Sequence, residues 1–315
     1  MFNRTRKEVL RLGQQTGFIQ NKLEKVLRLM DILNQINQHP HLQNQFVLKG
    51  GTALYLFYLN MARLSIDIDL NYIGNADKGV VETSRVEISQ ILQDIFSNEY
   101  HVSISKDTYA LTQLEFVYQT LSDTSDKLKL ELNYLHRIPI HQIQYLIKEI
   151  FGEKVQFPIL HIEELTASKI ITLLNRYTPR DLFDVYKIVD KFTIPENDLF
   201  RQLLLFYAVV SDTSVFRLFN PDFSKITPYN LRRFLVPLLP KGEYPDTQMI
   251  IQSVRKSILP LIRLSEKEHN ILSHFYKTGK IDWNQLTDNV LLANRIQQSP
   301  ALQWRVQSII KHLPG

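Results

Sequence analysis

Two aspartates, Asp67 and Asp69, lie one residue apart in the run RLSIDIDL. In a β-strand, residues i and i+2 project to the same side, so the two carboxylates share one face while Ile68 and Leu70 face the other way. Like charges on one face repel each other and are costly to desolvate unless a cation lies between them. The spacing therefore predicts a divalent metal site with oxygen ligands, and Mg²⁺ is the expected ion. The alternative is a polar face on an edge strand, which is less favoured because acidic residues are depleted in strands.

A glycine turn precedes these aspartates in the run KGGTAL, where Gly50, Gly51 and Thr52 follow Lys49. Glycine lets backbone N–H groups approach a phosphate closely, so the turn predicts a nucleoside triphosphate bound beside the metal. Ser65 shares the face of the aspartates if the strand has already begun there. Its hydroxyl would then contact a phosphate. The alternative is that Ser65 is only the last residue of the turn before the strand.

The run KLKLELNY offers one further carboxylate, Glu131. Its leucines alternate with polar residues, which predicts a strand with a leucine face in the core. Glu131 lies on the other face and would complete an acidic trio with Asp67 and Asp69 if the two strands are neighbours. The alternative is a cross-strand ion pair in which Lys129 takes part.

A third cluster lies in the run EELTASKIITLLNRYTPRDLFDVYKI. Lys169, Thr172 and Arg176 recur at helical spacing and line one face of a predicted helix. A lysine beside a triphosphate would neutralise charge that develops in the transition state, which makes Lys169 a candidate catalytic residue.

A second predicted helix follows at once, because Thr178 is a typical N-cap and Pro179 suits the first helical position. Asp181 then occupies the N3 position of a capping-box-like pattern, and Asp184 lies one turn further on. The alternative to a catalytic role is a structural network of ion pairs among Lys169, Arg180, Asp181 and Asp184.

The periodicity of the apolar residues divides the chain into an α+β part and a helical part. Helices are predicted over 18–38, 52–60 and 80–100, and strands over 46–48, 66–73, 100–106, 111–118 and 127–134. From about Ile162 onward the pattern is helical almost to the end. We therefore expect one domain over residues 1–157 and an all-α domain over residues 158–315.

The net charge of +5 is unevenly placed along the chain. Residues 1–194 hold 22 Lys/Arg and 22 Asp/Glu, whereas residues 195–315 hold 15 Lys/Arg against 10 Asp/Glu. A basic lobe beside an acidic metal site suits a protein that grips a polyanion, and an ordinary solvated surface is the open alternative. The candidate phosphate contacts in this lobe are Arg232, Arg233, Arg255 and Lys256. A further basic cluster at the N-terminus comprises Arg4, Arg6, Lys7 and Arg11.

Composition excludes several classes of site. The 315 residues include no cysteine, which excludes disulfides, thiol nucleophiles and cysteine-based metal sites. The sequence has no G-x-S-x-G, Walker A or G-x-G-x-x-G motif. The N-terminus lacks the apolar region of a signal peptide, and the longest apolar run, Leu203–Val210, is too short to span a bilayer. We therefore expect a cytoplasmic protein without a membrane partner.

In combination, KGGTAL, RLSIDIDL and the pattern K-x10-R-D-x-x-D between Lys169 and Asp184 resemble the AbiEii/AbiGii toxin family, to which the MenT toxins are related. The similarity runs through most of the chain, from GFIQNKLEKVLRLMDIL to SPALQW. Members of this family are nucleotidyltransferases with a DNA-polymerase-β-like fold, found in bacterial toxin–antitoxin and phage-defence loci. The resemblance implies a catalytic domain with a small mixed sheet, followed by a helical domain that contributes Lys169 and Asp184 to the site and a basic surface.

The resemblance also assigns roles to residues. The implied catalytic residues are Asp67, Asp69, Glu131, Lys169 and Asp184. A two-metal Mg²⁺ site would be held by Asp67, Asp69 and Glu131. The implied nucleotide contacts are Gly50, Gly51, Thr52, Ser65, Lys169, Arg180 and Asp181.

The implied reaction is the transfer of a nucleoside monophosphate from a nucleoside triphosphate to an acceptor, with release of pyrophosphate. The expected acceptor is tRNA, and the expected partner is an antitoxin encoded nearby, in many relatives one with a winged-helix domain. Two rivals stay open. One is transfer to a small-molecule hydroxyl, against which the basic lobe argues. The other is a non-catalytic nucleotide-binding partner in a defence complex, against which the intact Asp67, Asp69 and Lys169 argue.

Overall fold

The structure is a computed structural model that describes residues 2–313. The chain divides into two compact units. The first contains the residues up to Leu160 together with Leu235–Tyr244, and the second contains His161–Phe234 and the residues from Pro245 on.

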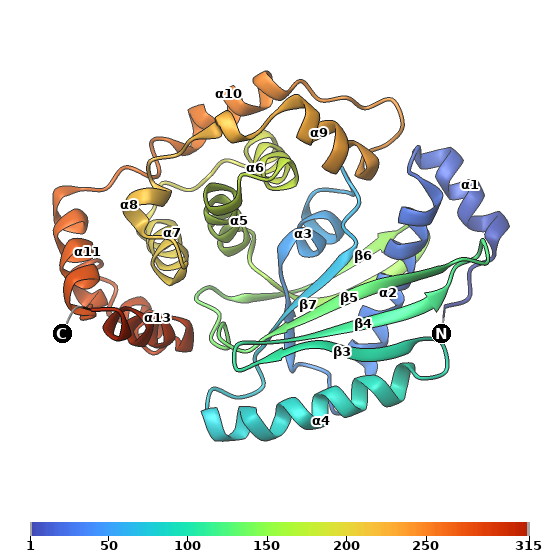
Figure 1. The fold of residues 1–315 in the computed structure, drawn as a ribbon, viewed down its shortest axis with the longest axis horizontal. Helices are drawn as coiled ribbons and strands as arrows, with labels where there is room; N and C mark the ends of the chain where they lie inside the picture. The colour runs from blue at the N-terminus through green and yellow to red at the C-terminus, as the bar shows by residue number, and fades with distance from the viewer. Residues whose placement is uncertain (1, 314–315) are drawn as a thin grey trace. The chain divides into compact units, whose positions relative to one another are not determined.

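The first unit is built on one seven-stranded sheet (Figure 1). The strands follow the spatial order β3-β4-β5-β2-β1-β7-β6. β2 pairs in parallel with β5 and β1 in parallel with β7, whereas the other neighbours are antiparallel, so the sheet is mixed as expected. The strands are β1 (Phe46–Leu48), β2 (Asp67–Tyr72), β3 (His101–Thr108), β4 (Leu111–Gln119), β5 (Ser125–Asn133), β6 (Ile143–Ile150) and β7 (Glu153–Leu160).

Several helices of the first unit pack on this sheet. The helical elements of this unit are α1 (Arg6–Thr16), α2 (Gln20–Gln38), α3 (Gly50–Ala53), the π-helical turn η1 (Leu54–Tyr58), α4 (Lys78–Phe96) and the 3₁₀ turn η3 (Val236–Leu238). α2 packs on β7 and α4 packs on β3. The N-cap Thr5 and Glu8 form a capping box at the start of α1, and Gly17 ends the helix in the left-handed conformation with a φ of 77°.

The second unit is helical throughout the part that the structure describes. Its elements are α5 (Ile162–Arg176), α6 (Pro179–Lys191), α7 (Asp198–Val210), α8 (Val215–Leu218), η2 (Phe223–Lys225), α9 (Pro228–Phe234), α10 (Thr247–Ile258), α11 (Glu266–Thr278), η4 (Trp283–Gln285), α12 (Val290–Gln297) and α13 (Pro300–Lys311). Gln202 is buried in this unit, where its side chain accepts a hydrogen bond from Trp283 Nε1 at 2.9 Å and donates one to Leu286 O at 3.0 Å. A buried amide satisfied in this way stabilises one packing arrangement of the core.

Most predicted elements are confirmed. The strand over 46–48 has the expected bounds, and the predicted helix over 18–38 corresponds to α2. The helix predicted over 52–60 is instead α3 followed by the π-helical turn Leu54–Tyr58. The helix therefore changes from α to the wider π geometry directly after the glycine turn.

The hairpin of β6 and β7 was not predicted. Its two-residue loop consists of Phe151 and Gly152, with φ angles of 54° and 78°. Such a loop requires positive φ at both positions, which favours Asn-Gly or Asp-Gly. Because phenylalanine occupies the first position, the sequence lacks the Asn-Gly or Asp-Gly pair that would have predicted this turn.

The described helices include none that is both long and apolar enough to cross a bilayer.

Candidate functional site

The two aspartates of β2 lie on its accessible face. Asp67 and Asp69 are partly exposed, whereas Ile68 and Leu70 between and after them are fully buried. This alternation confirms that the carboxylates share one face of the sheet.

Asp69 and Glu131 lie opposite each other on adjacent strands. β2 and β5 are parallel neighbours, and their register pairs Asp69 with Glu131 and Asp67 with Lys129. Paired residues on strands about 4.8 Å apart project to the same face. The condition for an acidic trio, that these two strands are neighbours, is therefore met.

The ion pair that was the alternative for Glu131 is also present. Lys129 Nζ contacts Glu131 Oε1, and the two side chains are 39% and 25% exposed. Partial burial tends to lower the pKa of Lys129, but the hydrogen bond that it donates to Glu131 and the charges of Glu131, Asp67 and Asp69 raise the pKa above its usual value. The raised pKa of Lys129 therefore shows that the three carboxylates together make this face of the sheet acidic.

The glycine turn lies against Asp69. Lys49 N donates to Asp69 O at 3.0 Å, and Gly50 follows with a φ of 71°. A Cβ on Gly50 would lie 2.6 Å from Asp69 Oδ2, closer than real side chains allow. Glycine is therefore favoured here by the backbone conformation, and any side chain would have to displace the Asp69 carboxylate.

Thr52 and Ser65 hold this turn to the strand. The buried Thr52 hydroxyl donates to Asp67 O at 2.5 Å and lies 3.1 Å from Ser65 Oγ. The hydroxyl of Ser65 would in turn lie 2.8 Å from a Cβ on Gly51. Ser65 precedes β2, yet its hydroxyl still lies at the turn.

Arg63, for which the sequence leaves a phosphate contact and a solvated side chain open, lies at the glycine turn and is buried. It is 3% exposed, its guanidinium lies 4.4 Å from the centre of the Tyr55 ring, and Nη1 donates to Leu64 O at 2.8 Å. Its Nη2 would lie 3.0 Å from a Cβ on Gly51. A buried guanidinium beside a glycine turn adds positive charge where an anion would bind.

Asn71 is a site residue that sequence reasoning missed. It continues the alternation of Asp67 and Asp69, pairs with Asn133 across β5 and is 2% exposed. Within residues 2–313, its Oδ1 has no hydrogen-bond donor. A buried oxygen acceptor left open is unusual. The i+2 spacing of Asp67, Asp69 and Asn71 is the signal that could have found it.

The oxygen-rich face of β2 and β5 suits a hard cation such as Mg²⁺. Its donors are the carboxylates of Asp67, Asp69 and Glu131, beside the open Asn71 oxygen. Among the described residues these three carboxylates do not form a set with ligand oxygens all within 4.8 Å of one another. Lys129 engages the Glu131 carboxylate in this arrangement.

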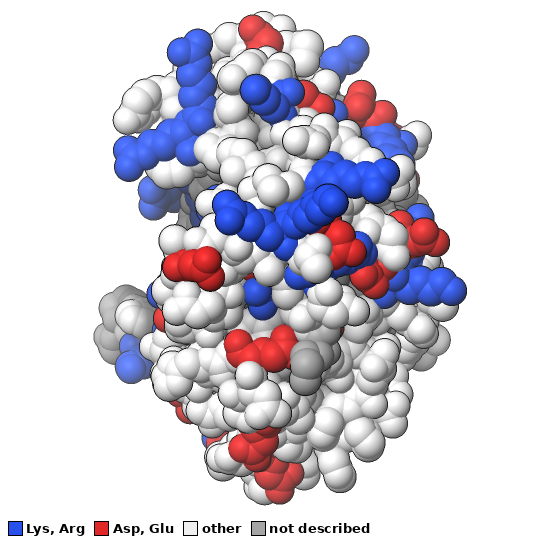
Figure 2. Space-filling model, turned by 90° about the vertical axis from the view of Figure 1, so that its right-hand side faces the viewer, with Lys and Arg blue, Asp and Glu red and all other residues white. Residues whose placement is uncertain are grey.

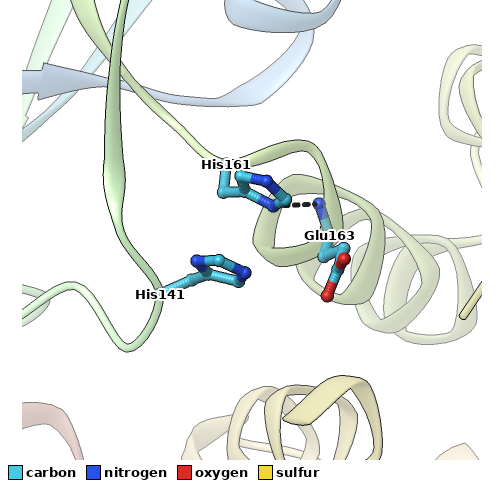
Figure 3. Close-up of side chains that lie close together, drawn as sticks. All are labelled: His141, His161 and Glu163. Atoms are coloured by element: carbon cyan, nitrogen blue, oxygen red, sulfur yellow. Dashed lines mark hydrogen bonds between the residues drawn. The ribbon is translucent and has the colours of Figure 1, made fainter. Parts of the chain in front are cut away.

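The second unit carries the other candidate residues, on α5 and α6. His161 precedes α5, and its Nδ1 accepts a hydrogen bond from Glu163 N at 3.3 Å (Figure 3). This cap fixes the start of the helix on which Lys169 lies.

Lys169 is buried between two aspartates. Its Nζ lies 3.0 Å from Asp184 Oδ2 and 3.2 Å from Asp181 Oδ1, and the side chains of Lys169, Asp181 and Asp184 are 10%, 3% and 0% exposed. Two buried carboxylates around one ammonium form a tight ion-pair network, as the structural alternative supposed. Whether Lys169 also touches a nucleotide stays a prediction.

The start of α6 has the predicted cap. Thr178 Oγ1 accepts from Asp181 N at 3.2 Å and donates to Asp181 Oδ2 at 2.6 Å, and Pro179 occupies the first turn. Arg176, at the end of α5, adds a 2.9 Å ion pair to Asp181 Oδ2. Arg180 is exposed on the same helix.

The basic residues divide into two groups. Arg232 and Arg233 are exposed on α9, and Arg255 and Lys256 are exposed on α10. In the N-terminal cluster, however, Arg4 is engaged within the fold: it pairs with Glu153 at 2.6 Å and donates to Phe151 O at 3.1 Å.

A protein-family model described as "Nucleotidyl transferase AbiEii toxin, Type IV TA system" matches residues 31–253, well over half of the chain. The chain belongs to this family. The matched span contains every residue that we assign to the glycine turn, the acidic face and the Lys169 cluster. The AbiEii-family protein is accordingly a nucleotidyltransferase toxin of a type IV toxin–antitoxin system, with a nucleoside triphosphate as substrate and an antitoxin as partner.

Solved structures resemble this AbiEii-family chain in fold. MenT4, a nucleotidyltransferase toxin from Mycobacterium tuberculosis, is 17% identical with a TM-score of 0.60, and the match covers 94% of this chain and 99% of that one. A putative nucleotidyltransferase and the protein JHP933, both from Helicobacter pylori, are each 19% identical. Their matches cover 94% of this chain and 97% and 94% of theirs, at TM-scores of 0.43 and 0.40. No protein of curated function matches the sequence.

Proposed function

We propose that this protein uses Mg²⁺ to transfer a nucleoside monophosphate from a nucleoside triphosphate to tRNA. The observation that supports the chemistry best is the pairing of Asp69 with Glu131 on adjacent strands, beside a glycine turn whose positive φ and close approach to Asp69 favour glycine. Carboxylates next to an anion-accepting turn are what a metal–triphosphate complex requires.

Asp67, Asp69 and Glu131 would hold the metal in a two-metal arrangement, and Asn71 offers a further oxygen. When bound, Mg²⁺ would neutralise the triphosphate and stabilise the leaving pyrophosphate. Glu131 must exchange its Lys129 partner for this role, and both side chains are exposed enough to move.

The protein's own groups perform the remaining tasks. Gly50 and Gly51 let phosphate oxygens approach the backbone, and Arg63 and Ser65 lie at the same turn. The acceptor hydroxyl oxygen bonds to the α-phosphorus while the bond to the bridging oxygen of pyrophosphate breaks. Glu131, if it is not a metal ligand, accepts the proton that this hydroxyl loses.

The later part of the family motif supplies four further candidate residues, namely Lys169, Arg180, Asp181 and Asp184. Lys169 would neutralise charge on the triphosphate, with Asp181 and Asp184 holding its ammonium in place. Their ion pairs fix the position of Lys169 within the second unit.

The acceptor is proposed from charge. Arg232, Arg233, Arg255 and Lys256 are exposed, and Lys and Arg side chains lie close together over part of the surface in Figure 2. A polyanion such as tRNA would displace counterions from such a surface.

The proposal is tested by transfer to RNA. Purified protein is incubated with total RNA, Mg²⁺ and each labelled nucleoside triphosphate in turn, and the labelled RNA is sized on a gel. We expect label at the size of tRNA, lost with a chelator and with Asp69→Asn. Asp123→Asn is the matched control, because Asp123 lies in a turn with a φ of 57° that asparagine tolerates. Undiminished labelling by Asp69→Asn would refute the assigned site.

Growth inhibition should depend on the same chemistry. Wild type, Asp67→Ala and Asp123→Asn are induced side by side in a bacterial host. We expect arrest from wild type and Asp123→Asn only, with growth restored by a neighbouring gene that encodes a winged-helix antitoxin. Equal arrest from Asp67→Ala would assign the harm to something other than catalysis.

A further inference from the structure

The short helix α9 presents aromatic and basic side chains together. Tyr229 is 67% exposed and Phe234 is 49% exposed, and Arg232 and Arg233 are exposed between them. Leu231 is 3% exposed and anchors the opposite side of the helix. Large aromatic residues at such exposure are normally scattered singly over a surface, whereas here two lie on one helix of seven residues.

Arg233 links the two rings. Its Nη1 lies 3.5 Å from the Tyr229 hydroxyl oxygen, four residues earlier on the helix. Its guanidinium carbon lies 5.2 Å from the centre of the Phe234 ring. The guanidinium therefore lies beside the Tyr229 hydroxyl and near the face of the Phe234 ring, and Arg232 is a helical neighbour of Tyr229 at i+3.

The surroundings of α9 are positive. α6 packs against both α9 and α10. These three helices carry seven Lys/Arg and three Asp/Glu. Asp181 and Asp184 are buried and paired with Lys169, and Asp181 also pairs with Arg176, so Asp190 is the one exposed carboxylate within these three helices.

We propose that Tyr229, Arg232, Arg233 and Phe234, here named the α9 surface, bind unpaired nucleotides of the RNA acceptor. The inference rests on the proposed function, because it supplies the contact for the acceptor of that reaction. Aromatic rings stack on bases of any sequence, and arginines between them pair with the phosphates that join those bases. Double-stranded RNA offers no open base faces, so the surface distinguishes a single-stranded end from a helix.

Binding of two RNA probes tests this inference. One is a hairpin with an unpaired 3′ tail and the other is the same hairpin with a blunt end, both labelled for fluorescence anisotropy. Tyr229→Ala and Phe234→Ala should each weaken binding of the tailed hairpin about tenfold and leave the blunt hairpin nearly unchanged. Arg232→Gln should weaken both probes alike and reduce the slope of log K against log salt by about 1.

Trp304→Ala on α13 is the matched control, since Trp304 is 50% exposed in the same unit. Its binding of both probes should equal that of wild type. Melting curves accompany every variant, although the removed side chains are exposed and should leave the fold intact.

The outcomes separate this inference from the proposed function. If wild type labels RNA but Tyr229→Ala and Phe234→Ala bind both hairpins as wild type does, the α9 surface is wrong and the transferase proposal stands. If wild type binds neither probe and labels no RNA, the RNA acceptor fails, and the α9 surface with it. If the variants bind RNA normally but escape the antitoxin, the surface belongs to the antitoxin and the inference is overturned.

Discussion

Asp69 on β2 and Glu131 on β5 lie opposite each other in a parallel pair, so two carboxylates far apart in the sequence share one face of the sheet. On the same face, Lys129 pairs with Glu131. The arrangement leaves Glu131 with two possible partners, its lysine and a bound cation, and this choice can be tested.

Glu131→Gln should reduce nucleotide transfer by about 10²-fold or more, because a glutamine neither accepts the proton of the acceptor nor ligates Mg²⁺ as a carboxylate does. Glu115→Gln provides the control. Glu115 pairs with Lys127 at 2.8 Å on the same sheet and has the same 25% exposure as Glu131. Equal activity of the two variants in the transfer assay would remove Glu131 from the site.

Gly50→Ala should abolish transfer and lower the free energy of unfolding by more than the strain of a positive φ alone, about 1–2 kcal/mol. The added Cβ would displace the Asp69 carboxylate. Gly242→Ala isolates the conformational part, since Gly242 has a φ of 92° with open space around its Cβ position. Urea unfolding and transfer rates are measured for both. A Gly50→Ala protein as active as Gly242→Ala would contradict the close packing of turn and carboxylate.

Lys169→Met should lower the free energy of unfolding by about 3–5 kcal/mol, because it removes the cation beside the buried Asp184 and leaves Asp181 with Arg176 alone. The triple variant Lys169→Met, Asp181→Asn, Asp184→Asn removes both charges and should recover much of this stability. Denaturant unfolding and transfer are compared in the two proteins. Recovered stability without recovered transfer would support a direct role for Lys169, whereas recovery of both would leave it purely structural.

His136 should make stability depend on pH. Burial, and secondarily the charge of Lys49, lower its pKa from 6.5 to about 3. The unfolded chain then binds a proton between about pH 6.5 and 3 that the folded protein does not, so stability is fully present above pH 6.5 and falls as the pH drops. Between pH 7.5 and 5.0 we expect His136→Gln to lose about 2 kcal/mol less than wild type. Parallel pH profiles of the two proteins in urea unfolding would refute the shift.

The sequence alone determined the features that arise from neighbouring residues. Alternation along a strand requires Asp67 and Asp69 to share a face, and the Thr178-Pro179 pair specifies the start of α6. Both follow from backbone geometry within a few residues. The family motif could be recognised for the same reason, because its parts are short and contiguous.

The tertiary structure decided which of these local features meet. Strand order is set by the packing of the whole sheet, so the pairing of β2 with β5, and of Asp69 with Glu131, could be stated only as a condition. The places of Arg63 at the glycine turn and of Asn71 beside the aspartates depend in the same way on burial by distant segments. The sequence left open whether Glu131 lies beside a carboxylate or beside a lysine. In the fold it lies beside both. The parallel pairing of β2 and β5 sets Asp69 opposite Glu131, and Lys129 lies two residues away on the same face of β5.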